Sequence, residues 1–185
     1  MNLMPKLALG FWNAWLLCVP WVLIGGVVAV FRKDVARRMS DMTGYSAKEK
    51  QVTVSASLAP YPFMAVAVWT PLSSIGGLLI LGLVLCVMGT AAFFSTVYVF
   101  ANAPLDQPLQ VGLYRVSRNP LYISAACVFL GICLATSSLV LFGIFIVLLV
   151  LQHFMVLAEE RACTRKYGEP YVAYARKVPR YLGWI

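Results

Sequence analysis

The residues best suited to chemistry lie in a short basic stretch, Gly112–Tyr122, which separates two long apolar segments. Asn119 is a preferred helix N-cap residue and Pro120 suits the first helical position, so the sequence predicts a helix that begins at Pro120. The free amide groups and the positive dipole end of such a helix attract anions. Arg115 and Arg118 lie just before this helix and would strengthen an anion site. The alternative is that both arginines only mark the edge of a membrane.

Two neighbouring carboxylates, Glu159 and Glu160, follow the last apolar segment. Two acidic residues at a helix C-terminus oppose the helix dipole, and a position that breaks a local rule is a candidate functional site. The alternative for one of the two is a surface salt bridge with Arg118, Arg161 or Arg165.

A third group of candidate residues is aromatic and consists of Tyr114, Tyr122, Tyr167, Tyr171 and Tyr174. If the arginines, the carboxylates and these rings meet, the site suits a ligand with a carboxylate, a cationic centre and a flat ring. S-adenosylmethionine carries these groups, but a nucleotide or a lipid headgroup would also fit. The side-chain chemistry alone therefore leaves three kinds of ligand open.

The elements that must hold these side chains are expected to be membrane helices. Of the 185 residues, 61% are hydrophobic and only 12% are charged, which is too apolar for a soluble domain. The net charge of +8 comes from basic residues clustered near helix ends, so it does not indicate a nucleic-acid partner. The five cysteines form no CxxC pair, and we expect neither a disulfide framework nor a metal site.

The apolar pattern predicts five transmembrane segments, at residues 9–31, 52–69, 75–101, 121–134 and 139–157. Pro60 and Pro62 fall inside the second segment and predict a kink or local unwinding. In the third segment, Gly82, Cys86 and Gly89 recur at helical spacing and predict a close helix contact.

The last two segments are predicted to form a tight helical hairpin with its turn at residues 135–138. Such a hairpin would place the basic stretch at the start of one helix beside the carboxylates at the end of the other. The loops and the tail on this side carry every Lys and Arg except Lys6. The positive-inside rule then predicts an amino terminus outside, and a carboxyl terminus and site in the cytoplasm.

The only histidine, His153, lies inside the fifth predicted segment. A polar residue at that depth is a functional hypothesis by default, and it is seven residues from Glu160 on the same helix face. We favour a buried interhelical hydrogen bond over a role in a pocket.

The basic stretch and the tail together resemble the isoprenylcysteine carboxyl methyltransferase and phospholipid methyltransferase superfamily of integral membrane enzymes. The shared motifs are Gly-x-Tyr-Arg, Arg-Asn-Pro with a Tyr two residues later, Glu-Glu, Tyr-Gly, spaced tyrosines and Val-Pro, over residues 110–182. There are two departures. Asn119 stands where the isoprenylcysteine enzymes usually have His, which favours the phospholipid methyltransferase branch, and Ser124 stands where Gly is common. Because of these two departures, the resemblance does not identify the methyl acceptor.

The resemblance implies an all-α polytopic membrane protein with about five transmembrane helices, a C-terminal helical hairpin and a cytoplasmic helical tail. It also implies S-adenosylmethionine as the cofactor, held by Tyr114, Arg115, Arg118, Asn119, Pro120, Tyr122, Glu159, Glu160 and Tyr167. For catalysis we select Glu160 and Arg165. Glu159 or Glu160 could take a proton from an ammonium acceptor, and Arg165 could instead hold an anionic acceptor.

The expected function is methyl transfer to a lipophilic acceptor such as an isoprenylcysteine carboxylate or a phospholipid amine. Residues 1–111 would shape the acceptor pocket, and residues 112–185 would hold the cofactor. Membrane lipids and the acceptor are the expected partners, and the oligomeric state is left open. The alternative is a non-catalytic membrane protein that binds lipid headgroups or serves as an assembly subunit.

Overall fold

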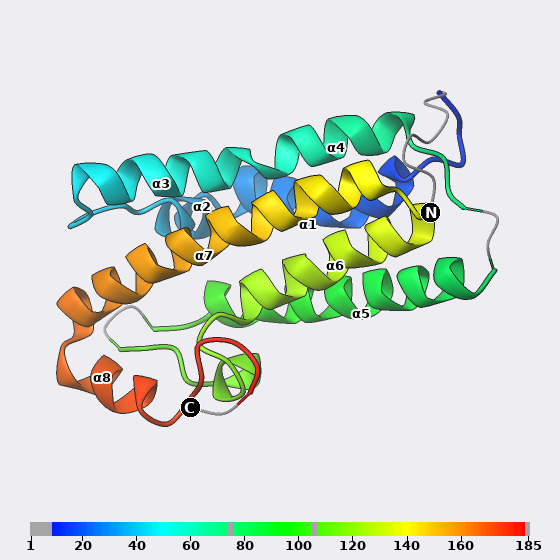
Figure 1. The fold of residues 1–185 in the computed structure, drawn as a ribbon. Helices are drawn as coiled ribbons and strands as arrows, with labels where there is room; N and C mark the ends of the chain where they lie inside the picture. Colours follow the sequence, from blue (N-terminus) through cyan, green and yellow to red (C-terminus); the bar gives the residue numbers. More distant parts are fainter. Residues whose placement is uncertain (1–8, 74–75, 105–106, 184–185) are drawn as a thin grey trace.

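The computed structural model describes residues 9–73, 76–104 and 107–183, and the regular secondary structure of these residues is helical, as the sequence predicted. The long helices lie side by side in one bundle, with the short helices α2 and α8 at the same end (Figure 1). The elements are α1 (Trp15–Phe31), α2 (Lys33–Met39), α3 (Ala47–Leu58), α4 (Pro60–Trp69), α5 (Gly76–Ala101), the 3₁₀ turn η1 (Gly112–Arg115), α6 (Pro120–Thr136), α7 (Leu139–Tyr167) and α8 (Glu169–Ala175).

The number of candidate membrane spans differs from the predicted five. Within the described residues, three helical stretches are long and apolar enough to cross a membrane, namely residues 47–69, 76–101 and 139–167. A fourth exists only if α1 is counted together with α2, to which it is bent by 111°. Helices α1 and α6 have 17 residues each, about 26 Å, which is less than the hydrocarbon core of about 30 Å. The chain is a multi-helix membrane protein, but the count of five is not confirmed.

The second predicted segment begins earlier than expected, at Ala47. Ser46 and Glu49 form a capping box, in which the Ser46 side chain accepts from the Glu49 amide and the Glu49 carboxylate accepts from the Ser46 amide. These polar residues were expected in the loop between the first two predicted segments, so that expectation is wrong for residues 47–51. The expected break is confirmed, since α3 stops at Leu58 and Pro60 opens α4.

The close helix contact predicted around Gly82 is confirmed, and its partner is α6. A Cβ atom at Gly82 would lie 2.5 Å from the carbonyl oxygen of Gly131, so the two backbones touch. One turn further along α5, the Cys86 thiol donates to the Val128 carbonyl. Helix α6 is therefore short but largely buried, with Ile132 fully enclosed.

The predicted hairpin between α6 and α7 is also confirmed. Helix α6 ends at Thr136, Ser137 adopts a left-handed conformation (φ 51°), and the Ser138 side chain accepts from the Leu141 amide at the start of α7. However, α7 continues without interruption to Tyr167 and ends at Gly168 (φ 61°). The expected position of the two glutamates at a helix C-terminus is therefore wrong, because the polar residues after Leu157 extend the helix.

The tail contains a helix, as predicted, and turns back along the molecule. Helix α8 packs through Tyr171 and Tyr174 against Cys163 and Tyr167 of α7, and Val178 completes this small apolar cluster. The chain then returns toward η1 and the start of α6 (Figure 1).

Candidate functional site

A cavity of about 370 Å³ opens at the end of the bundle that carries α2 and α8. Its wall comes from the end of α5, the start of α6, the last third of α7, helix α8 and the loop between α2 and α3. The volume lies within the range of small-molecule pockets, about 300–1,000 Å³. Most of the residues expected to hold a cofactor line it, namely Tyr114, Arg118, Asn119, Tyr122, Glu159, Glu160 and Tyr167.

Three of the residues selected from the sequence are not part of this wall. Pro120 is buried at the first position of α6, and Arg115 is exposed on η1. The Arg165 guanidinium lies 3.2 Å from the Glu49 carboxylate, which also accepts a 2.7 Å hydrogen bond from Arg161. Arg161 and Arg165 of α7 thus join Glu49 of α3, and the structure does not bring Arg165 into the cavity.

Donor groups of the protein occupy both carboxylate oxygens of Glu160. Its side chain is 10% exposed, with one carboxylate oxygen accepting from the Asn119 amide (2.9 Å) and the other from Arg180 Nε (2.9 Å). Arg118 Nε lies 3.5 Å from the first oxygen. The salt bridge considered for one of the two glutamates is therefore present, with Arg180 as its closest cation.

The Asn119 side chain does not cap α6, contrary to our expectation. Its amide nitrogen donates to Glu160 and to the carbonyl oxygen of Arg180 (3.1 Å) instead. The Asn119 side chain thus makes long-range hydrogen bonds in place of the local helix cap that this residue type favours. Helix α6 still begins at Pro120, whose fixed φ angle suits that position.

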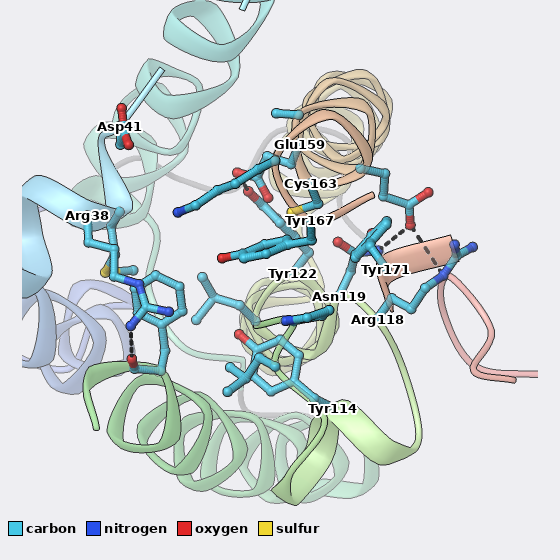
Figure 2. A pocket seen from close by; sticks show the side chains of 18 of the residues that line it. Arg38, Asp41, Tyr114, Arg118, Asn119, Tyr122, Glu159, Cys163, Tyr167 and Tyr171 are labelled. Atoms are coloured by element: carbon cyan, nitrogen blue, oxygen red, sulfur yellow. Dashed lines mark hydrogen bonds and ion pairs between the residues drawn. The ribbon is translucent and has the colours of Figure 1, made fainter. Parts of the chain in front are cut away.

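Glu159, by contrast, faces the cavity with one partner. It accepts a short hydrogen bond from the Tyr122 hydroxyl, and within the described residues it forms no ion pair (Figure 2). A partly buried carboxylate without a cation is costly unless a ligand supplies one. Of the two adjacent glutamates, Glu159 therefore presents its carboxylate to the cavity, whereas protein groups already bind the carboxylate of Glu160.

Tyrosines form much of the remaining wall (Figure 2). Burial raises the pKa of Tyr114, Tyr171 and Tyr174 above the ordinary value of a phenol, so these rings stay neutral. The Tyr174 hydroxyl donates to the Tyr114 carbonyl (2.7 Å), which fixes α8 against η1. Neutral aromatic faces suit a cationic or flat ligand.

Residues 32–51, expected to be a basic loop, also contribute to the cavity wall, which the sequence did not predict. Arg38 near the end of α2 and Asp41 just after it line the cavity on the side opposite Tyr114 and Tyr122 (Figure 2). The Arg38 guanidinium donates to the Phe100 carbonyl (3.0 Å) and lies 4.3 Å from that ring. The basic character of the loop was the available signal, but it indicated only the side of the membrane.

His153 does not line the cavity. Its Nδ1 atom is joined to the Tyr181 hydroxyl by a hydrogen bond of 3.0 Å. A structural hydrogen bond was the favoured role, but the partner belongs to the C-terminal loop and not to another helix. As predicted, His153 and Glu160 share one face of α7, because both contact neighbouring residues of that loop.

Comparison with known proteins gives one match. A family model described as phospholipid methyltransferase matches residues 72–170, which is more than half of the chain. The matched region runs from the start of α5 into α8 and includes both carboxylates and the basic stretch. Neither a curated protein nor a solved structure matches the chain.

Proposed function

The chain belongs to the phospholipid methyltransferase family, and from this premise we propose that its cavity binds S-adenosylmethionine for methyl transfer to a lipophilic acceptor. Family membership makes the protein a membrane methyltransferase and agrees with the superfamily resemblance of the sequence. The proposal adds the methyl donor, its site and the class of acceptor.

The observation that carries the proposal is the free carboxylate of Glu159. Because it has a hydroxyl partner but forms no ion pair among the residues that the structure describes, it favours a ligand with a positive group at that point. S-adenosylmethionine, when bound, supplies an electrophilic methyl group on a sulfonium and also carries an ammonium group. We assign Glu159 to the ammonium and the surrounding tyrosine faces to the sulfonium and the adenine ring.

Arg118 is suited to the opposite end of the ligand. Its side chain is 14% exposed and lines the cavity, and its Nε atom is buried and lies 3.5 Å from Glu160, without a hydrogen bond in the described part of the chain. A guanidinium with free donors binds a carboxylate well, often through two parallel hydrogen bonds. Arg118 and Glu159 thus provide the two charges that an amino-acid group requires.

The protein's contribution to the reaction is alignment of the two reactants and exclusion of water. An ammonium acceptor must lose a proton before it attacks, and a carboxylate within hydrogen-bond reach can accept it. Glu160 is not suited to this role, because both of its oxygens already accept hydrogen bonds. The apolar wall residues Val97, Leu121 and Met155 suit a lipophilic acceptor.

Calorimetry with S-adenosylhomocysteine tests the assignment. The wild-type protein is expected to bind, and Glu159→Gln to weaken binding by about 1.5–3 kcal/mol, the range for a hydrogen bond to a charged group. Glu169→Gln is the matched control, because Glu169 is exposed at the start of α8 and away from the cavity wall. A wild-type protein that binds neither this compound nor S-adenosylmethionine would overturn the proposal.

A further inference from the structure

The C-terminal strap, which we define as Val178–Tyr181, lies against the start of α6. It follows α8 and is outside the matched residues 72–170. The Pro179 carbonyl accepts from the Arg118 amide (2.9 Å), and the Arg180 carbonyl accepts from the Ser117 hydroxyl (3.0 Å). The strap therefore fixes the backbone just before the cavity.

The Arg180 side chain binds Glu160 of α7, which in turn contacts Asn119 just before α6. Its Nε and one terminal nitrogen both lie 2.9 Å from a single oxygen of Glu160, Oε2. The other oxygen, Oε1, is left for the Asn119 amide, with Arg118 Nε at the longer distance of 3.5 Å. Arg180 thus supplies the charge that a buried Glu160 requires.

This arrangement has a consequence for Arg118. Arg118 already forms an ion pair with Glu160, at 3.5 Å, which is longer than either contact of Arg180. Without Arg180, we expect Arg118 to neutralise the buried carboxylate alone and to be drawn closer to it. The interaction of Arg180 with Glu160 would therefore limit how strongly Arg118 is committed to Glu160.

We propose that Arg180 is a positioning residue, which acts through Glu160 to keep Arg118 and Asn119 in the geometry that binds the methyl donor. The inference rests on the proposed function for the identity of that donor. It extends the site beyond the region that the family model matches, to a residue that does not itself line the cavity.

The test uses Arg180→Gln in the full-length, detergent-solubilised protein. Affinity for S-adenosylhomocysteine is expected to fall about tenfold, and the KM for S-adenosylmethionine to rise by a similar factor with kcat changed less than about threefold, because only binding groups move. Arg180→Lys should restore part of the affinity, since an ammonium still neutralises Glu160. Arg176→Gln is the matched control, an exposed arginine in the same tail, and should bind as the wild type does.

The double variant Arg180→Gln/Glu160→Gln separates positioning from a general effect on folding. If Arg180 acts through Glu160, its replacement should reduce affinity by less than about twofold once Glu160 is already neutral. A full additional loss in the Glu160→Gln background would overturn the inference, as would wild-type affinity in Arg180→Gln.

Hydrogen exchange gives a measurement that does not depend on the methyl donor. The Arg118 amide should exchange about tenfold faster in Arg180→Gln than in wild type or Arg176→Gln, whereas amides of the contact between α5 and α6 should not change. If the wild type binds no methyl donor, the proposed function fails, and this measurement alone decides whether Arg180 holds the start of α6. Unchanged exchange at Arg118 would contradict the role of Arg180 in either case.

Discussion

At the scale of single residues, the site depends on which charges the protein already neutralises. Glu159 and Glu160 are adjacent and identical in type, but only Glu160 accepts hydrogen bonds from Arg180 and Asn119. The sequence placed both glutamates near Arg118, and this proved right because a hairpin brings its two ends together. It did not separate their roles, since the deciding partner, Arg180, is 20 residues further along the chain.

The same distinction applies to the two arginines of the basic stretch. We expect Arg118→Ala to weaken binding of S-adenosylhomocysteine by about 1.5–3 kcal/mol, because it removes the cation assigned to the ligand carboxylate. Arg115→Ala should have no measurable effect, since Arg115 is exposed on η1 and is not part of the cavity wall. Calorimetry on both variants checks this, and equal losses would restore Arg115 to the site as the sequence analysis had it.

At the scale of elements, local patterns predicted local structure well. The start of α6 at Pro120, the break at Pro60 and the small residues of α5 all depend on neighbours in the chain. One error was local, since α7 runs on to Tyr167 through polar residues that were expected to follow the helix. The other concerns distant segments: the Arg38 guanidinium binds the carbonyl of Phe100 at the end of α5, 62 residues away, and no local pattern encodes that contact.

The contact between α5 and α6 should tolerate no added volume. Gly82→Ala is expected to destabilise the protein by about 1–3 kcal/mol or more, because its Cβ would overlap the backbone of α6. Gly143→Ala in α7 is the control, since a Cβ there meets nothing within 4 Å. Thermal unfolding in detergent measures both, and similar midpoints for the two variants would contradict the close packing.

At the scale of the whole molecule, the cavity is assembled from both halves of the chain. The loop after α2 and the tail line the same cavity and therefore lie at the same end of the bundle, while the turn between α6 and α7 lies at the other (Figure 1). The sequence placed the cofactor site in residues 112–185 and the acceptor pocket in residues 1–111, a division that stays a prediction. Arg38, Tyr45 and Phe100 of the first half line the cavity together with Tyr114 and residues that follow it.

The orientation in the membrane stays a prediction of the charge distribution. We expect the tail and residues 32–51 to be cytoplasmic, because basic residues concentrate there. Reporter proteins fused after Ile185 and inserted in the turn between α6 and α7 should indicate opposite sides. The same side for both would show that the hairpin does not cross the bilayer.

The length of α7 sets the depth at which the chemistry takes place. Glu159 lies 20 residues after Leu139, the first residue of the helix, a rise of about 30 Å, which equals the thickness of the hydrocarbon layer. If α7 enters the bilayer at Leu139, we expect the Glu159 carboxylate to lie level with the headgroups of one leaflet. The proposed lipid acceptor would there keep its chains among those of its neighbours, and avoid an extraction cost of about 0.8 kcal/mol for each CH₂ group withdrawn. The proposed water-soluble methyl donor would reach it from the aqueous side, so neither reactant would have to leave its own phase.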